Sequence, residues 1–120
     1  MDLREEADNP ISICSLREGA LDLVTQMMQQ VISVVGPSNL AYLHIGADEV
    51  FNFASCQDCK LFVDQASHKI LFARWIKKIV KRLIRDHPDL KIMAWDDMFR
   101  SWSSTDLSLL KISSSKSQEN

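Results

Sequence analysis

The 120-residue sequence predicts an α/β fold in which helices cover a parallel sheet. Two segments show helical hydrophobic periodicity, and two short apolar segments are typical of strands. They alternate along the chain as helix, strand, helix, strand, which favours a parallel sheet. Both predicted strands end in carboxylates. In folds of this class the functional groups gather at the C-terminal ends of the strands.

Composition and charge limit the possible functions. The chain is 46% hydrophobic and 25% charged, as in a globular domain, and its net charge of −2 gives no overall attraction to nucleic acid or acidic membranes. There is no apolar run of about 18 residues and no secretory signal pattern. Three cysteines, an odd number, do not form a disulfide framework. We therefore expect one domain in a reducing compartment, the cytoplasm or alternatively the nucleus, with no nucleic-acid or membrane partner.

The first predicted helix follows a polar, irregular segment at residues 1–18. From Arg17 onward, apolar residues recur at helical spacing. The predicted core face is formed by Ala20, Leu21, Val24, Met27, Met28, Val31 and Ile32. Gly36 and Pro37 end the helix, as a glycine near the C-cap followed by proline commonly does.

The first predicted strand covers residues 40–45. This segment is short and apolar with few polar insertions, which is typical of a strand buried on both faces. Gly46 ends the strand. Residues 50–60 are expected to form a loop.

The second predicted helix is the clearest of the chain, and Pro88 closes it. Its apolar stripe is formed by Phe72, Trp75, Ile76, Ile79, Val80 and Leu83. The opposite face is basic, and we interpret it as a solvated face rather than a nucleic-acid surface. Residues 90–95 then predict a second buried strand, which ends in Asp96 and Asp97.

Periodicity is lost after Phe99. Residues 101–120 contain eight serines and no further strand or helix pattern. We therefore expect a folded domain at residues 1–100 and a disordered, serine-rich tail at residues 101–120.

Asp48 and Glu49 are the strongest functional candidates. They follow a predicted strand through Gly46 and Ala47, which permit a sharp bend, so that both carboxylates can reach one ligand. Two close carboxylates repel each other, which favours keeping one of them protonated as a general acid. The alternative is a solvated loop that carries two ordinary acids.

Residues 44–50, with the sequence HIGADEV, resemble the His-x-Gly-Gly/Ala-Asp-Glu signature of family 20 glycoside hydrolases, the β-N-acetylhexosaminidases. Residues 95–98, WDDM, resemble the tryptophan-bearing end of the following strand in that family. The resemblance covers roughly residues 8–100 and is greatest to the hexosaminidase D type. It implies a (β/α)8 barrel, of which this chain would hold the central strands and helices only. Asp96 and Asp97 would bind sugar hydroxyls or cap the segment that follows.

The resemblance also implies a substrate-assisted, retaining mechanism, in which the 2-acetamido carbonyl oxygen of the sugar is the nucleophile. Glu49 would protonate the leaving oxygen and later act as base toward water, and Asp48 would orient the acetamido N–H. Trp95 would wall the acetamido methyl or pack in the core, and His44 would contact substrate or serve as a hydrogen-bonded structural residue. The implied substrate is a glycoside or glycoconjugate with a terminal non-reducing N-acetylhexosamine. No metal or cofactor is implied.

Cys56 and Cys59 form a rival motif with the spacing Cys-x-x-Cys. A single pair, with Cys14 far upstream and His68 nine residues beyond, does not predict a closed zinc site. A redox pair near a helix start is a further alternative. Cysteines of a loop, without a ligand role, are the favoured interpretation.

The size of the chain limits the expected activity. A (β/α)8 barrel takes about 250 residues. The sequence has no matched position for the family's earlier arginine, or for the later tyrosine, aspartate and tryptophan that complete the acetamido pocket. We therefore expect this chain alone to be a weak or inactive enzyme. The alternative from another class is a non-catalytic, truncated product that misfolds or pairs with another chain.

Overall fold

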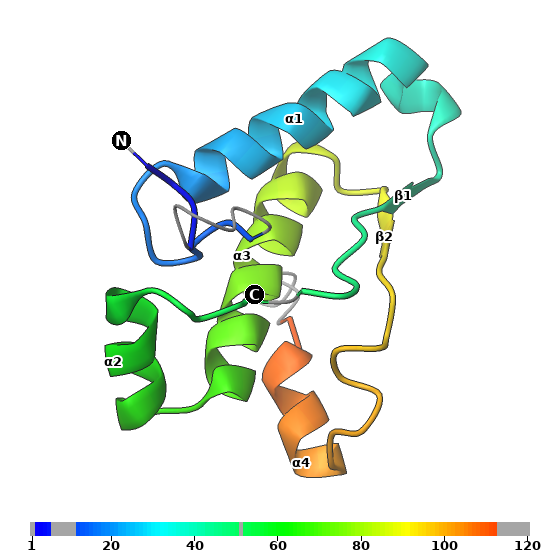
Figure 1. The fold of residues 1–120 in the computed structure, drawn as a ribbon. Helices are drawn as coiled ribbons and strands as arrows, with labels where there is room; N and C mark the ends of the chain where they lie inside the picture. The colour runs from blue at the N-terminus through cyan, green and yellow to red at the C-terminus, as the bar shows by residue number, and fades with distance from the viewer. Residues whose placement is uncertain (1, 6–11, 51, 113–120) are drawn as a thin grey trace, which may run out of the picture.

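The computed structural model describes residues 2–5, 12–50 and 52–112, in which two long helices pack beside a two-stranded parallel sheet (Figure 1). The elements in chain order are α1 (Ala20–Val35), the 3₁₀ turn η1 (Pro37–Asn39), β1 (Tyr42–His44), α2 (Gln57–Gln65), α3 (His68–Asp86), β2 (Lys91–Met93), α4 (Ser104–Leu107) and the 3₁₀ turn η2 (Ser108–Leu110). The predicted alternation of helices and strands is confirmed, with α2 as an additional helix. The described sheet has two strands, so the partial barrel remains a prediction.

The two strands pair in parallel, with His44 opposite Met93. Pairing continues past the strand ends, because the Trp95 N–H donates to the Gly46 carbonyl oxygen at 2.9 Å. The segments that leave β1 and β2 therefore stay side by side. This register brings residues 46–49 and 95–97 to the same edge of the sheet.

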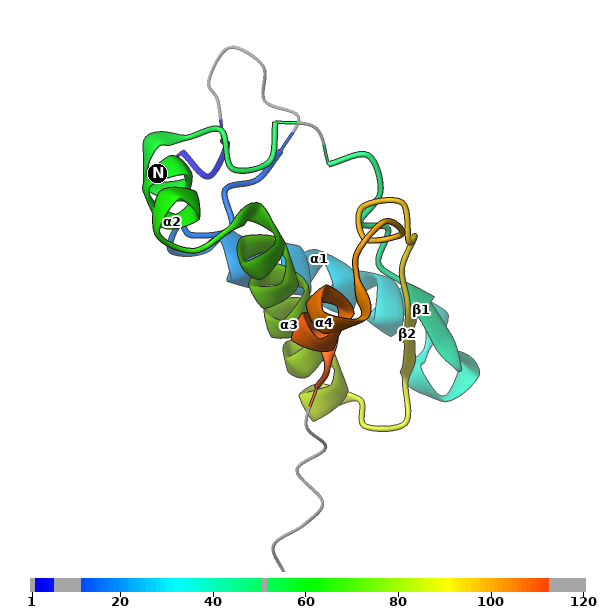
Figure 2. The same ribbon diagram turned by 90° about the horizontal axis from the view of Figure 1, so that it is seen from below.

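The main core lies between α1, α3 and one face of the sheet. Its buried members are Met28, Ile32, Leu43, Ile79, Leu83 and Leu90. Leu43 is the member of this cluster that β1 contributes, and burial of a leucine side chain contributes about 1.5–3 kcal/mol. Packing in the core therefore fixes the position of β1, and with it the position of the turn that follows. In the view of Figure 2, the sheet and α2 lie on opposite sides of α3.

The prediction of strands buried on both faces is wrong. Leu43 is 8% exposed, whereas Tyr42 is 54% and Met93 is 49% exposed. In the described part of the chain the core lies on one side of the sheet only. Side chains that alternate with Leu43 therefore point away from the core.

The predicted core face of α1 was too wide. Met28 and Ile32 are buried, but Met27 is 56% and Val31 is 47% exposed. One face of α1 contacts α3 and the sheet. Met27 and Val31 lie beside this face and stay exposed to solvent. None of the helices in the described ranges combines the length and apolarity needed to cross a membrane.

The prediction of a disordered tail from residue 101 onward is wrong for the part that the structure describes. α4 begins with a capping box, in which the Ser103 hydroxyl accepts from the Asp106 N–H and the Asp106 carboxylate accepts from the Ser103 N–H. Serine was misleading there because it is one of the favoured helix N-caps. Residues 113–120 lie outside the described residues, so the prediction stands untested for them.

Two contacts attach this C-terminal segment to α3. The Trp102 ring meets the Phe72 ring edge-on, with centroids 6.0 Å apart. The Lys69 ammonium lies 2.6 Å from the Asp106 carboxylate. Buried aromatic surface and a charge-assisted hydrogen bond thus order a segment whose composition resembles that of a linker.

Candidate functional site

The turn after β1 has an unusual backbone. Gly46, Ala47 and Glu49 have φ angles of 75°, 70° and 44°, all in the left-handed region. The bend predicted from Gly46 and Ala47 is therefore confirmed. Left-handed non-glycine residues cost roughly 1–3 kcal/mol each and tend to cluster at functional sites. We call residues 46–49 the acid turn.

The acid turn presents both of its carboxylates to solvent-accessible hollows. The Asp48 and Glu49 side chains are exposed. One hollow of about 190 Å³ is lined by Asp48, Glu49, Trp95, Asp96, Asp97 and Arg100. A larger one of about 390 Å³ extends from the same two acids toward α1 and α3. Both acids can therefore reach one ligand, which is the arrangement that the bend was expected to allow.

Asp97 connects the two strand ends. One of its carboxylate oxygens, Oδ2, accepts a hydrogen bond from the Glu49 N–H at 2.9 Å. Neither expected role, hydroxyl binding or capping of its own segment, includes this contact. The acceptor holds the backbone of Glu49 in its left-handed conformation. Asp97 is thus placed to position the acid turn, a role that only the pairing of the strands makes visible.

Asp96 has a different partner from its neighbour. The Arg100 guanidinium donates to its two oxygens at 2.7 and 3.3 Å. These hydrogen bonds hold the pKa of the Asp96 carboxyl below its usual range, so it stays ionised at neutral pH. Arg100 consequently places a positive charge on the wall of the hollow that the two acids share.

His44 and Trp95 lie against each other at the strand ends. Their ring centroids are 4.9 Å apart at an interplanar angle of 54°. Trp95 is 57% exposed and lines the hollow with the acids, so it is not a core tryptophan. The His44 Nδ1 accepts from the Gly46 N–H at 3.0 Å, which fixes the ring against the acid turn. His44 is not among the residues that line the hollow.

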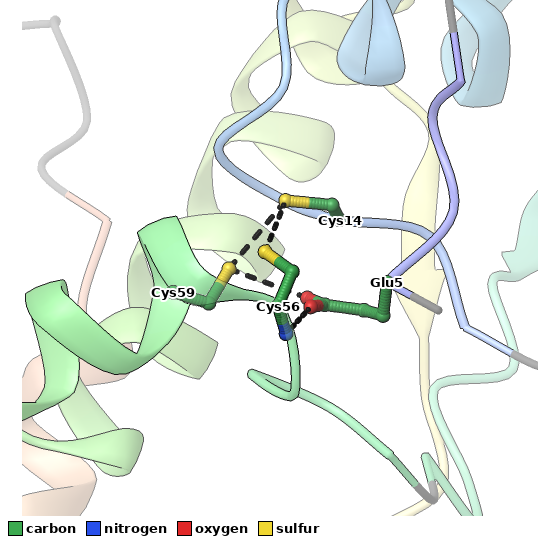
Figure 3. Close-up of side chains that lie close together, drawn as sticks. All are labelled: Glu5, Cys14, Cys56 and Cys59. Atoms are coloured by element: carbon green, nitrogen blue, oxygen red, sulfur yellow. Dashed lines mark hydrogen bonds between the residues drawn. The ribbon is translucent and has the colours of Figure 1, made fainter. Parts of the chain in front are cut away.

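A second constellation joins Glu5, Cys14, Cys56 and Cys59 (Figure 3). The Cys14 sulfur lies 3.5 Å from the sulfurs of both other cysteines, and the Cys59 sulfur lies 3.3 Å from the Glu5 Oε1. All four residues are buried, and one potential ligand atom from each lies within 4.8 Å of the others. We call this group the cysteine cluster.

The prediction of a loop over residues 50–60 is wrong from Gln57 onward, where α2 begins, and the absence of a ligand role for the cysteines stays a prediction. Cys56 is the N-cap of α2, and Cys59 lies in its first turn. The upstream members arrive through an isolated antiparallel bridge, Arg4 with Ile13, in a segment expected to be irregular. No local sequence signal predicts that bridge, so the cluster could not be found from spacing alone.

Burial raises the pKa of both Cys56 and Cys59 above the ordinary range. Reactive redox cysteines have lowered pKa values and partial exposure instead. Cys59 is 0% and Cys56 is 8% exposed. The geometry therefore disfavours the redox alternative for this pair.

Comparison with known proteins adds one finding. The family described as Glycosyl hydrolase family 20, catalytic domain, matches residues 3–118. No curated protein and no solved structure gave a significant match. The matched range includes the acid turn and the cysteine cluster, and it continues past residue 100, where the sequence had suggested an end to the domain. The chain belongs to family 20 of the glycosyl hydrolases.

Proposed function

We propose that this chain carries the acid pair of a β-N-acetylhexosaminidase, and that this enzyme hydrolyses terminal non-reducing N-acetylhexosamine residues with retention. One observation carries the proposal: Asp48 and Glu49, on a strained turn after β1, share a hollow with Trp95 and Asp97 from the end of β2. Within the family we propose the hexosaminidase D type, to which the resemblance over roughly residues 8–100 is greatest.

The proposed roles follow from the chemistry of an acetamido-assisted reaction. The carbonyl oxygen of the 2-acetamido group attacks the anomeric carbon while Glu49 protonates the leaving oxygen, which breaks the glycosidic bond. Asp48 accepts from the acetamido N–H and stabilises the cationic intermediate. Glu49 then removes a proton from water, which opens the intermediate. Adjacent acids suit this division because they address different parts of one sugar.

Three neighbours of the acids have supporting roles. The exposed Trp95 ring offers an apolar face to the acetamido methyl group or to the sugar ring. Asp97 acts through the backbone of Glu49, so it is a positioning residue. His44, held by its hydrogen bond with the Gly46 N–H, packs against the Trp95 ring and so orients it. Free thiols at Cys14, Cys56 and Cys59 suit a reducing compartment, for which we propose the cytoplasm, with the nucleus as alternative.

The exposure of the site bears on the rate. Electrostatic stabilisation is strongest where water is excluded, and here both acids and Trp95 are exposed. We therefore expect slow turnover by this chain alone. The same observation favours a second candidate, a non-catalytic member of the family that retains the acid turn.

Hydrolysis of aryl 2-acetamido-2-deoxy-β-glycosides by the purified full chain separates these possibilities. The matched control is the aryl glycoside with a 2-hydroxyl group in place of the acetamido group. We expect slow release from the first substrate and none from the second. Equal release from both would contradict the substrate-assisted mechanism, and no release from either would establish the non-catalytic alternative.

A further inference from the structure

We propose that Glu5, Cys14, Cys56 and Cys59 form a structural zinc site, which ties the N-terminal segment to the start of α2. This inference concerns residues outside the acid turn and does not depend on the proposed function.

The spacing of the four side chains matches tetrahedral coordination. A zinc ion with Zn–S bonds of about 2.3 Å and a Zn–O bond of about 2.1 Å sets its sulfurs about 3.8 Å apart and sulfur and oxygen about 3.6 Å apart. The observed separations are 3.5 Å between Cys14 and each of the other sulfurs, and 3.3 Å between the Cys59 sulfur and the Glu5 oxygen. Movements of a few tenths of an ångström would therefore suffice.

The Glu5 carboxylate points to a cation rather than to simple packing. It is 5% exposed, and its described partners are neutral donors: the N–H groups of Ala54 and Cys56 and the thiol of Cys59. A buried carboxylate without a compensating charge is costly. Two backbone N–H groups and a thiol do not compensate the negative charge of this carboxylate, whereas a divalent cation would.

Arg17 provides a second, independent observation. Its guanidinium lies beside the side chains of Cys14 and Cys56. Its Nε is buried and has no hydrogen-bond partner in the described part of the chain. Zinc-bound thiolates are hydrogen-bond acceptors and are commonly supported by such outer donors. As zinc-bound thiolates, Cys14 and Cys56 would be stronger acceptors for the Arg17 guanidinium that lies beside them.

A disulfide explains the geometry less well. Cys14 is equally far from Cys56 and Cys59, so the three sulfurs converge on one point rather than forming one pair and one bystander. A disulfide would also leave the third thiol outside the bond and would not compensate the charge of the buried Glu5 carboxylate. Thiolate ligands select soft metals, and a closed set of four ligands without an open position is typical of structural zinc. Binding would release the three thiol protons to solvent.

The location of the cluster gives the site a structural consequence. Cys56 ends the loop that begins at the acid turn, and two residues of that loop, Asn52 and Ala54, have φ angles of 57° and 63°. The Glu5 carboxylate already holds the N–H groups of Ala54 and Cys56. Zinc bound there would fix the far end of the strained loop that carries the acids.

Metal content and cobalt substitution test the proposal on the full chain, purified under reducing conditions without chelator. We expect about one zinc ion per chain by elemental mass spectrometry. After exchange with Co²⁺, we expect thiolate-to-metal charge transfer together with the intense visible bands of tetrahedral cobalt. These wild-type measurements need no variant, so they remain decisive if substitutions prevent folding.

Variants identify the ligands. Cys14→Ser should reduce the charge-transfer intensity by roughly one third, since one of three thiolates is lost. Glu5→Gln should keep the charge-transfer bands but weaken zinc binding at least about tenfold in competition with a chromophoric chelator. The matched control, Glu18→Gln at an exposed glutamate, should change neither.

Three results would contradict a structural zinc site. A wild-type cobalt spectrum without charge transfer, or zinc binding as weak as that of Cys14→Ser, would overturn the proposal. A mass lower by two hydrogen atoms in zinc-free protein that is stable only when oxidised would replace it with a disulfide.

Discussion

The acid turn and the cysteine cluster lie at the two ends of one loop, residues 46–56, yet they are built in opposite ways. The acid turn is contiguous in sequence, strained and exposed, with its carboxylates on open hollows. The cysteine cluster is assembled from three distant segments and is buried, with its polar atoms directed at one another. A strained and exposed turn suits carboxylates that must contact a substrate. A buried group of converging side chains suits a role in holding distant segments of the chain together.

The largest expected effect belongs to the acid turn. Glu49→Gln should lower turnover of an aryl 2-acetamido glycoside by roughly 10²–10⁴-fold, the usual contribution of a general acid–base residue. The loss should be greatest for poorly acidic aryl alcohols, because they depend most on protonation by Glu49. The zinc content should stay unchanged, because Glu49 is not one of the proposed zinc ligands.

The control for this variant is Glu18→Gln, again at an exposed glutamate outside both regions. Rates for a series of leaving groups, measured side by side for both variants, check the prediction. A loss that does not vary with the leaving group would remove Glu49 from the role of acid.

The next effect concerns the core that carries the acid turn. Leu43→Ala should lower the free energy of unfolding by about 2–5 kcal/mol, because Leu43 is 8% exposed and belongs to the main core cluster. Leu61→Ala is the matched control, since Leu61 on α2 is 53% exposed. Chemical denaturation of both variants gives the comparison, and equal losses would mean that β1 is not anchored through Leu43.

A smaller effect is expected at the contact between the strand ends. Asp97→Ala should lower kcat roughly ten- to hundredfold with little change in KM, because the Glu49 backbone loses its acceptor and the acid is misplaced. Asp97→Asn keeps an acceptor oxygen and should recover part of the rate. A change confined to KM in both variants would instead indicate direct substrate binding by Asp97.

The smallest effect lies outside both regions, in the ion pair between Lys69 and Asp106. Hydrogen bonds from Lys69 and Ser103 lower the pKa of the Asp106 carboxyl. A lowered folded-state pKa adds stability that is complete above the unfolded value of about 3.9 and is lost as pH falls through the lowered value. As pH falls from about 4 through the lowered pKa, the contribution of this pair to the packing of α4 on α3 should therefore be lost.

Lys69→Met should move this acid-dependent step to higher pH, because the largest cause of the lowered pKa is lost, whereas Lys81→Met, at an exposed lysine of the same helix, should leave it in place. Amide chemical shifts of α4 recorded across the pH range measure the step. Identical titration in both variants would show that the pair does not hold α4.

The same comparison explains which features the sequence could predict. The acid turn was predicted because strand, glycine and acids are adjacent in the chain, so a local pattern carries the whole feature. Both long helices are predictable for the same reason, through their hydrophobic periodicity, and both strands through their short apolar runs.

Other features depend on pairing between distant segments, and local patterns do not carry them. Glu5 reaches Cys59 only through the bridge of Arg4 with Ile13, and Asp97 reaches Glu49 only through the register of the sheet. The serine-rich composition of the C-terminal segment predicts a tail, but the Trp102 ring packs on Phe72 and helps to order the segment. Composition describes the average of a segment, whereas the packing of one aromatic ring can order it.

The central claim is that the acid turn serves a reaction in which the substrate's acetamido oxygen is the nucleophile. A series of aryl 2-acetamido glycosides with zero to three fluorine atoms on the acetyl methyl group tests it most directly, because each fluorine weakens that nucleophile. The account predicts that the turnover rate of the wild-type chain falls stepwise along the series. A rate that does not depend on fluorination would contradict it.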